Sequence, residues 1–152
     1  MKKISLTYLT AAAVAPLVIV TASSEASAAG YIQWVNAATG RCLKTVDGDV
    51  KTGSCDGDSA SWFDIRVADG DAFQIRPNGW KGHKCLDSNK AGSVYIRYCE
   101  PGNRNQIWYE MKTSTGWMLL NDATQRVLDS NRNGSVYTNL NEGDKNKYQR
   151  WH

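Results

Sequence analysis

One stretch of the sequence occurs three times, and this repetition limits the folds open to the chain more than any other feature. Residues 84–108 return almost unchanged as residues 126–151, and a more divergent copy occupies residues 41–62. Cys42 and Cys85 lie 43 residues apart, Cys85 and Val127 lie 42 apart, and Trp108 and Trp151 lie 43 apart. A fixed period of this size is typical of folds built from repeats, in which one unit cannot bury its apolar face alone.

Residues 1–28 have the features of a secretory signal peptide. Two lysines follow the first methionine, residues 9–20 are mostly apolar, and Ala26-Ser27-Ala28 is a small-x-small cleavage site. A membrane anchor is the alternative, but the apolar run is shorter than the ~20 residues needed to cross a bilayer. We therefore expect a signal peptide at residues 1–28, one folded domain at residues 29–152, and a secreted, extracellular product.

The charge of the expected mature domain is close to balanced. Of the 18 basic and 15 acidic residues, two lysines and one glutamate fall within residues 1–28, which leaves 16 basic and 14 acidic residues. Both signs are scattered along the chain, whereas a nucleic-acid-binding protein would show a basic patch. No second long apolar segment follows. We therefore expect neither nucleic-acid binding nor membrane insertion.

Four cysteines in a secreted chain indicate two disulfides, for which three pairings exist. Cys42 and Cys55 occupy the same positions in the first copy as Cys85 and Cys99 do in the second, and the third copy lacks both cysteines together. Loss in pairs, copy by copy, favours the bridges Cys42–Cys55 and Cys85–Cys99. A zinc site is the alternative, but the sequence has no CxxC pair. We expect no metal and no cofactor.

The sequence after residue 28 shows short strand-like runs separated by turn clusters, without helical periodicity. Each copy, with the strand before it, supplies about four strands, and the repeats span approximately residues 31–70, 71–115 and 116–152. A propeller also has four strands per unit but needs at least about four units. Three units fit an all-β barrel capped by hairpins, a β-trefoil with pseudo-threefold symmetry. The expected strands include residues 31–35, 72–76, 93–98, 107–111, 117–120 and 135–139.

Two motifs carry a resemblance to a known family. QxW triplets close the second and third copies, as Gln106-Ile107-Trp108 and Gln149-Arg150-Trp151. Cys85-Leu86-Asp87, with Cys99 downstream, is echoed by Val127-Leu128-Asp129. Together these motifs resemble the ricin B-type lectin family, and the resemblance covers essentially all of residues 29–152. It implies a β-trefoil of three repeats that binds sugars.

Most of this signature explains the fold rather than the function. The glutamines of the QxW triplets are expected to tie backbone groups within their repeats. One tryptophan and one leucine per repeat are expected in the core near the pseudo-threefold axis: Trp62, Trp108 and Trp151, with Leu43, Leu86 and Leu128.

The resemblance implies a shallow sugar pocket in a repeat, made by an Asp, an outward aromatic ring and an Asn just before QxW. An aromatic ring suits the apolar face of a pyranose, and its hydroxyls need polar partners. In the second repeat these positions hold Asp87, Arg97 and Asn105, beside Gln106. Because Asp87 follows Leu86, an expected core residue, its side chain should point outward.

Arg97 departs from the family's aromatic residue. Strand alternation should put Val94, Ile96 and Tyr98 on one face and Tyr95 and Arg97 on the other. Tyr95 is therefore the candidate for the missing ring, and an exposed strand tyrosine without a ligand is the alternative.

The third repeat keeps Asp129 and Gln149 and places Tyr137 where Tyr95 stands. Asn139 replaces the aromatic residue, and Tyr148 replaces the Asn before QxW. This repeat is a weaker candidate pocket than the second. The first repeat is expected to bind nothing, because its three positions hold Lys44, Gly53 and Ser59.

These features favour a secreted carbohydrate-binding protein that recognises sugars chiefly through the second repeat. The alternative is a β-trefoil adaptor or inhibitor whose loops bind a secreted protein partner such as an enzyme or toxin subunit. We expect a monomer without enzymatic activity, because His83 and His152 have no evident nucleophile or carboxylate partner in the sequence.

Overall fold

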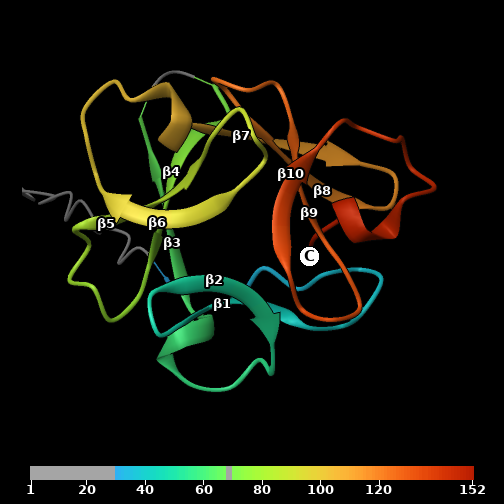
Figure 1. Cartoon of the computed structure of the whole chain (residues 1–152), viewed down its shortest axis with the longest axis horizontal. Helices are drawn as coiled ribbons and strands as arrows, with labels where there is room; N and C mark the ends of the chain where they lie inside the picture. The colour runs from blue at the N-terminus through green and yellow to red at the C-terminus, as the bar shows by residue number, and fades with distance from the viewer. Residues whose placement is uncertain (1–29, 68–69) are drawn as a thin grey trace, which may run out of the picture.

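The computed structural model describes residues 30–67 and 70–152, so the expected signal peptide at residues 1–28 lies outside the described residues. The described chain is built of short strands and three-residue 3₁₀ helices (Figure 1). No helix within it is long and apolar enough to cross a membrane. The elements are β1 (Cys42–Val46), β2 (Asp49–Gly53), η1 (Asp58–Ala60), β3 (Trp62–Arg66), β4 (Ala72–Pro77), β5 (Lys84–Ser88), β6 (Val94–Tyr98), η2 (Arg104–Gln106), β7 (Trp108–Thr113), β8 (Gly116–Asn121), β9 (Val127–Ser130), β10 (Val136–Asn139) and η3 (Lys147–Gln149).

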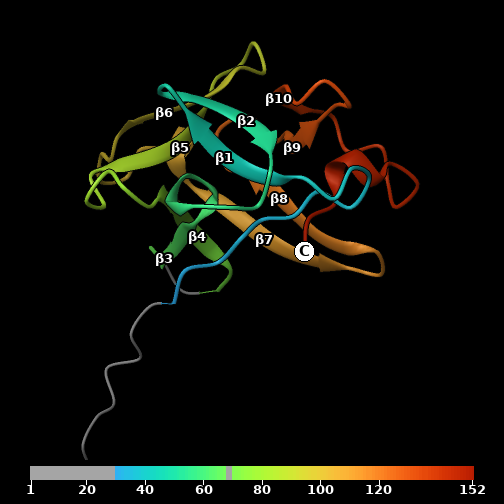
Figure 2. The same ribbon diagram turned by 90° about the horizontal axis from the view of Figure 1, so that it is seen from below.

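Strands β3, β4, β7 and β8 form an antiparallel barrel wall in the order β8-β7-β4-β3. The first and last segments of the domain complete the wall through isolated bridges: Ile32 pairs with Trp62, and Trp151 pairs with both Asn36 and Trp117. Figure 2 shows this wall on one side of the molecule and the hairpins β1–β2, β5–β6 and β9–β10 on the other. A six-part barrel capped by three hairpins is a β-trefoil, which confirms the predicted fold class.

The three hairpins meet one another around the centre of the molecule (Figure 1). Each contributes to two bridges between hairpins: Asp49–Tyr95, Lys51–Ser135 and Ser93–Tyr137. Every hairpin therefore touches the other two, so no repeat buries its inner face without its neighbours.

Two loop glycines allow this close approach. Gly92 (φ 87°) accepts a 2.8 Å hydrogen bond from the Thr138 amide, and Gly134 (φ 91°) accepts one of the same length from the Thr52 amide. A Cβ at either glycine would lie within 3 Å of a neighbouring carbonyl oxygen, at 2.8 Å for Gly92 and 2.9 Å for Gly134. Only glycine combines this backbone conformation with so little space.

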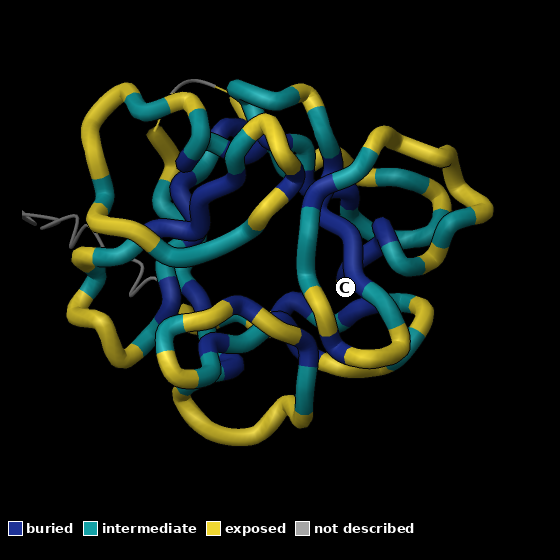
Figure 3. Tube along the Cα trace, viewed as in Figure 1, coloured by how far each residue is buried: buried dark blue, intermediate teal, exposed yellow. Residues whose placement is uncertain are grey.

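The core repeats itself three times, as predicted. Trp62, Trp108 and Trp151 are fully buried. Figure 3 shows in dark blue where the buried segments of the chain run. Each indole N–H donates to the carbonyl oxygen of the buried leucine on the first hairpin strand of its own repeat: Leu43 (2.7 Å), Leu86 (2.9 Å) and Leu128 (3.2 Å). A buried indole N–H needs such an acceptor, because leaving it unpaired would cost about 1–3 kcal/mol.

The predicted disulfides Cys42–Cys55 and Cys85–Cys99 are both present. Each joins the first strand of a hairpin to the loop after its second strand, with Cα atoms 5.0 and 5.1 Å apart. In the chain-entropy picture, a bridge over a loop of this size stabilises by about 3 kcal/mol.

The predicted strand at residues 31–35 is wrong as a continuous element, whereas the other five runs fall on β4, β6, β7, β8 and β10. Ile32 pairs with Trp62, but Val35 exchanges backbone hydrogen bonds with His152 at 2.8 and 2.9 Å, and the Trp34 carbonyl accepts one from the Leu43 amide. The segment changes partner every two or three residues, so it forms bridges rather than one ladder.

Candidate functional site

The hairpin register places an acidic and an aromatic residue opposite each other in the second and third repeats. Asp87 on β5 pairs with Tyr95 on β6, and Asp129 on β9 pairs with Tyr137 on β10. Directly opposed residues of an antiparallel pair point to the same face, with Cβ atoms about 5 Å apart. The structure therefore brings together Asp and Tyr in each of the two repeats that the sequence singled out.

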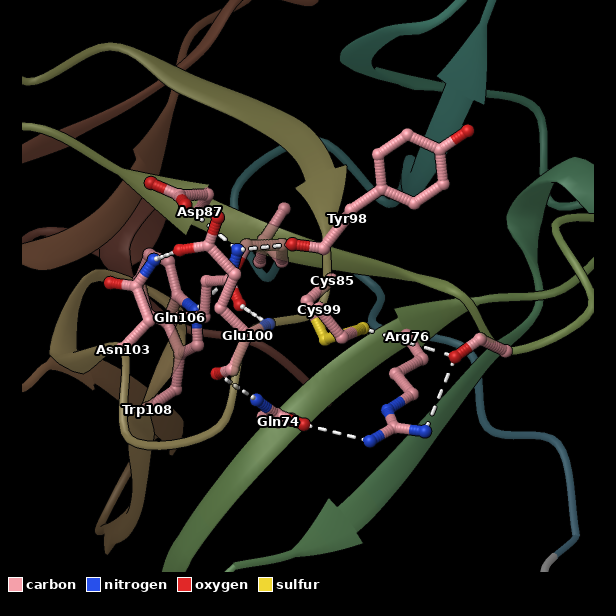
Figure 4. The surroundings of a disulfide bond; sticks show 12 residues. Gln74, Arg76, Cys85, Asp87, Tyr98, Cys99, Glu100, Asn103, Gln106 and Trp108 are labelled. Atoms are coloured by element: carbon pink, nitrogen blue, oxygen red, sulfur yellow. Dashed lines mark hydrogen bonds between the residues drawn. A yellow bond between two sulfur atoms is a disulfide. The ribbon is translucent and has the colours of Figure 1, made fainter.

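Gln106, the glutamine of the QxW triplet in the second repeat, hydrogen-bonds to Asp87 (Figure 4). The Gln106 amide nitrogen donates to Asp87 Oδ2 (3.1 Å) and to the Tyr98 carbonyl (2.9 Å), and its oxygen accepts from the Glu100 amide (2.9 Å). Gln106 is fully buried. Both of its N–H donors and its oxygen are thus used internally, as expected for a residue that ties its repeat together.

The third repeat has the same arrangement. The Gln149 amide nitrogen donates to Asp129 Oδ2 (3.0 Å) and to the Leu140 carbonyl (2.8 Å), and its oxygen accepts from the Glu142 amide (2.9 Å). The other oxygen of Asp129 accepts from the Ser130 amide at 2.7 Å. Burial raises the pKa of Asp129 despite these hydrogen bonds.

Asp87 points away from the Leu86 side of its strand, as expected, but it does not reach the surface, because only 1% of it is exposed. Its strand is covered on both faces, by the core on the Leu86 side and by the loop that carries Gln106 on the other. Asp87 Oδ1 is buried without a hydrogen-bond partner among the described residues. Asp87 therefore lies beneath the surface of the second repeat.

The side chains of β6 alternate between its two faces as predicted, with Tyr95 and Arg97 on the Asp87 side. Val94 and Ile96 pack on the core as predicted, but Tyr98 is 67% exposed at the strand end, with the Lys84 ammonium 3.5 Å from its ring centre. Figure 4 shows its ring directed away from Asp87. Tyr95, half-buried, is the ring beside Asp87: burial raises its pKa, and the Asp87 carboxylate raises it further. Arg97 is exposed.

A hollow of about 540 Å³ opens on the third repeat. It contains the predicted Asp129, Tyr137 and Asn139, and Tyr148 as well. Gln149 does not line it. The hollow also has polar lining residues that sequence analysis did not name: Ser130, Asn131, Arg132, Asn133, Glu142 and Asn146. Asn131, Arg132 and Asn133 have a sequence signal, the five-residue hairpin loop that the second and third repeats share and the first repeat lacks.

The first repeat fills its own site. Lys44 occupies the Asp position opposite Lys51, and Gly53 occupies the position of Arg97 and Asn139. The Lys44 stem lies so close to Gly53 that a Cβ there would be 2.8 Å from Lys44 Cδ. The ammonium donates to the Ser54 carbonyl at 3.2 Å and lies 3.6 Å from Asp56. The Lys44 side chain therefore occupies the space in which the other two repeats have their Asp.

A pair of carboxyl groups lies outside these sites, inside the barrel. Asp64 and Glu110 line a hollow of about 420 Å³ together with Trp34, Trp117 and His152, among others. Burial, more than any other cause, raises the pKa of Asp64 to about 6. Burial and the neighbouring charge of Asp64 raise the pKa of Glu110 to about 8. Each of the two acids therefore keeps its proton to a higher pH than it would in water.

Three hairpin-capped repeats, each closed by a buried tryptophan, define this chain as a β-trefoil. Residues 28–151 match the ricin-type beta-trefoil lectin domain, and the chain belongs to that family. No curated protein matches the sequence.

Among solved structures, the designed threefold-symmetric protein ThreeFoil is 22% identical over 80% of this chain and 96% of its own, with a TM-score of 0.68. SeviL bound to asialo-GM1 saccharide is 19% identical over 80% of this chain and 94% of its own (TM-score 0.66). A Polyporus squamosus lectin bound to a human-type influenza-binding epitope is 23% identical over 80% of this chain and 47% of its own (TM-score 0.64). At these identities, the similarity establishes the fold.

Proposed function

We propose that the protein is a secreted, non-enzymatic carbohydrate-binding protein that holds sugars in the second and third repeats. The observation that carries this proposal is the open hollow of the third repeat, in which Asp129 and Tyr137 lie on one face among amide and hydroxyl groups. A sugar needs such a combination of an aromatic surface and directional polar partners.

Membership of the ricin-type lectin family supports the proposal. So do the two neighbours solved with saccharides, SeviL and the Polyporus squamosus lectin. Two disulfides suit a secreted protein. We further propose that residues 1–28 are removed and that residues 29–152 act as a monomer.

The second repeat supports the proposal by a different feature. Asp87 Oδ1 lacks a partner among the described residues, so the site holds a spare buried acceptor beside the half-buried Tyr95. Because this oxygen is buried, a sugar hydroxyl would reach it once the Tyr95 side chain moves aside. Asn105, which is partly exposed in η2, is the remaining polar candidate at this site.

A glycan array with residues 29–152, followed by calorimetry on the best hit, tests the proposal. Asp129→Asn and Asp87→Asn each remove a charged acceptor, which should weaken binding about ten- to a hundredfold at a site that uses it. Asp47→Asn makes the same change in the turn of the first hairpin and should leave affinity unchanged.

Removing the tyrosine rings tests whether they contact a sugar or are tyrosines without a ligand. Tyr95→Ala and Tyr137→Ala should each weaken their own site, whereas Arg97→Ala should matter less. Melting curves must show that each variant is folded. If both Asp variants bind as well as the wild type, the site assignment is wrong. If the array yields no hit, sugar binding is wrong and a protein partner becomes the function to test.

A further inference from the structure

A second hollow, of about 680 Å³, adjoins the one that contains Asp129. The two share the four residues that form the wall between them: Arg132, Glu142, Asn146 and Tyr148. The adjoining hollow also contains Lys145, Lys147 and the backbone turn at Ala37. The third repeat therefore presents two connected depressions.

Three cations gather at the adjoining hollow without an acidic partner. Arg132, Lys145 and Lys147 are exposed, and within the described residues none of them lies within 4 Å of a carboxylate. The Glu142 carboxylate in the same wall accepts a 3.0 Å hydrogen bond from the Asn146 amide. Three positive charges against one negative charge leave this depression with an excess of positive charge.

The pseudo-threefold symmetry provides an internal reference for this charge. Lys147 opens η3 as Arg104 opens η2. In the second repeat, Arg104 is neutralised by Asp122, with Nε and Oδ2 2.7 Å apart. This hydrogen bond lowers the pKa of Asp122 and raises that of Arg104.

Ala37 occupies the position of Asp122 beside Lys147. The Ala37 amide donates to the carbonyl of Arg150, the residue after Gln149, at 2.8 Å. In the same way, the Asp122 amide donates to the carbonyl of Ile107, the residue after Gln106, at 2.9 Å. The third repeat thus has the cation of the second repeat without its counter-ion, and it adds Lys145.

Arg132 is held in position for an anion. Its Nε donates to the Tyr148 hydroxyl at 2.9 Å, while its carbonyl accepts from the Arg41 side chain at 3.1 Å. Arginine has five N–H donors in a rigid fork. The described contacts of the Arg132 side chain use one of them, so donors remain for a carboxylate or sulfate.

We propose that the third repeat binds an acidic saccharide, with a neutral sugar unit at Asp129 and a carboxylate or sulfate group at Arg132, Lys145 and Lys147. This inference rests on the proposed sugar-binding function and names the substrate class of the same site. The Asp129 carboxylate repels an anion at its own end of the groove, which fixes the direction in which the saccharide lies.

Restoring the missing counter-ion tests the inference. Ala37→Asp places beside Lys147 the acid that Asp122 supplies to Arg104, and Arg132→Gln removes the held guanidinium. The matched control is Lys90→Gln, which removes a positive charge from the corresponding hairpin-loop position of the second repeat. All variants are first checked for wild-type melting temperatures.

The probe is an array that carries the same oligosaccharide cores in neutral, uronic-acid and sulfated forms, followed by calorimetry with the best acidic hit. Ala37→Asp and Arg132→Gln should each weaken the acidic form about tenfold or more. Ala37→Asp should leave the binding of neutral cores unaffected, and Lys90→Gln should bind as the wild type does. The uronic-acid and sulfated arms distinguish the two sources of the anion, and sodium sulfate is added as a competitor.

Preference for neutral cores, or an equal loss in Lys90→Gln, would overturn the acidic specificity while leaving sugar binding intact. Competition by sodium sulfate at the same concentrations as the glycan would show a simple anion site and overturn the saccharide reading. If no glycan binds at all, the proposed function itself fails, which is a separate outcome.

Discussion

Replacing Glu110 by Gln should make the protein less sensitive to alkaline pH. Glu110 and Asp64 line one hollow inside the barrel, and their pKa values are raised to about 8 and about 6. In the unfolded chain both carboxyl groups release their protons near pH ~4. As pH rises between these values, the folded state retains protons that the unfolded state has lost, so the free energy of unfolding falls.

The magnitude follows from the same values. The rise in the pKa of Asp64 from 3.8 to about 6 corresponds to about 3 kcal/mol, at about 1.4 kcal/mol per pKa unit. Glu110 is partly solvated, which reduces its contribution to the free energy of unfolding. The repulsion between Asp64 and Glu110 is a single interaction, so it is counted once. Between about pH 5 and about pH 8.5, Asp64 contributes about 1.4 kcal/mol, because the rest of its loss occurs below pH ~5, and Glu110, after the reduction for solvent, contributes about 2 kcal/mol. We therefore expect the pair to cost about 3 kcal/mol in this range, or about 10 °C in Tm for a domain of this size.

Thermal unfolding at a series of pH values measures this cost. The variants are Glu110→Gln and the control Glu100→Gln, which makes the same change on an exposed loop. Arg66, which favours the charged form of Glu110, and Asp71, which opposes it, are unchanged in both. Glu110→Gln should lose less than half as much Tm as the wild type does. The reasoning is refuted if the wild-type Tm does not fall with pH, or if Glu110→Gln falls as steeply.

Three further predictions concern stability. Removing Trp151 and the residue after it should lower Tm by about 10 °C or more, because a buried tryptophan typically contributes about 3–5 kcal/mol; an unchanged melting curve would show that the third repeat does not close the barrel. Replacing Cys85 and Cys99 together by Ala should cost about 3 kcal/mol in guanidinium unfolding, and a loss near zero would contradict the role given to the bridge. Gly134→Ala should cost clearly more than Gly143→Ala, because both glycines have positive φ but only Gly134 faces a carbonyl oxygen, 2.9 Å from an added Cβ; equal losses would show that the close approach is unimportant.

The fold could be predicted from the sequence because its main determinants recur at a fixed period. Trp62, Trp108 and Trp151 mark the same core position three times, and cysteines that are lost in pairs identify their partners. The segment at residues 31–35 could not be predicted in this way. Its pairing depends on residues from both ends of the domain rather than on its own pattern.

The candidate sites were predicted by residue identity but not by environment. Alignment of the copies found Asp87 and Asp129, yet it could not show that the QxW loop covers them, because burial depends on where η2 and η3 lie. The Asp64–Glu110 pair gave no signal at all. Both acids stand two residues after the tryptophan of their repeat, but nothing in the sequence shows that these two positions meet, because only closure of the barrel brings β3 and β7 around one hollow.

The closure of the barrel by its first and last segments has a consequence for how the chain folds. Val35 and His152 exchange backbone hydrogen bonds, and Trp151 bridges Asn36 and Trp117. Contacts between residues so distant in sequence form slowly, because the chain between them must first be ordered. A ribosome that still holds residues 151–152 leaves the barrel open and its apolar interior exposed. We therefore expect the domain to reach its native state only once residues 151–152 are free to pair, and in one cooperative step, although its sequence consists of three similar repeats.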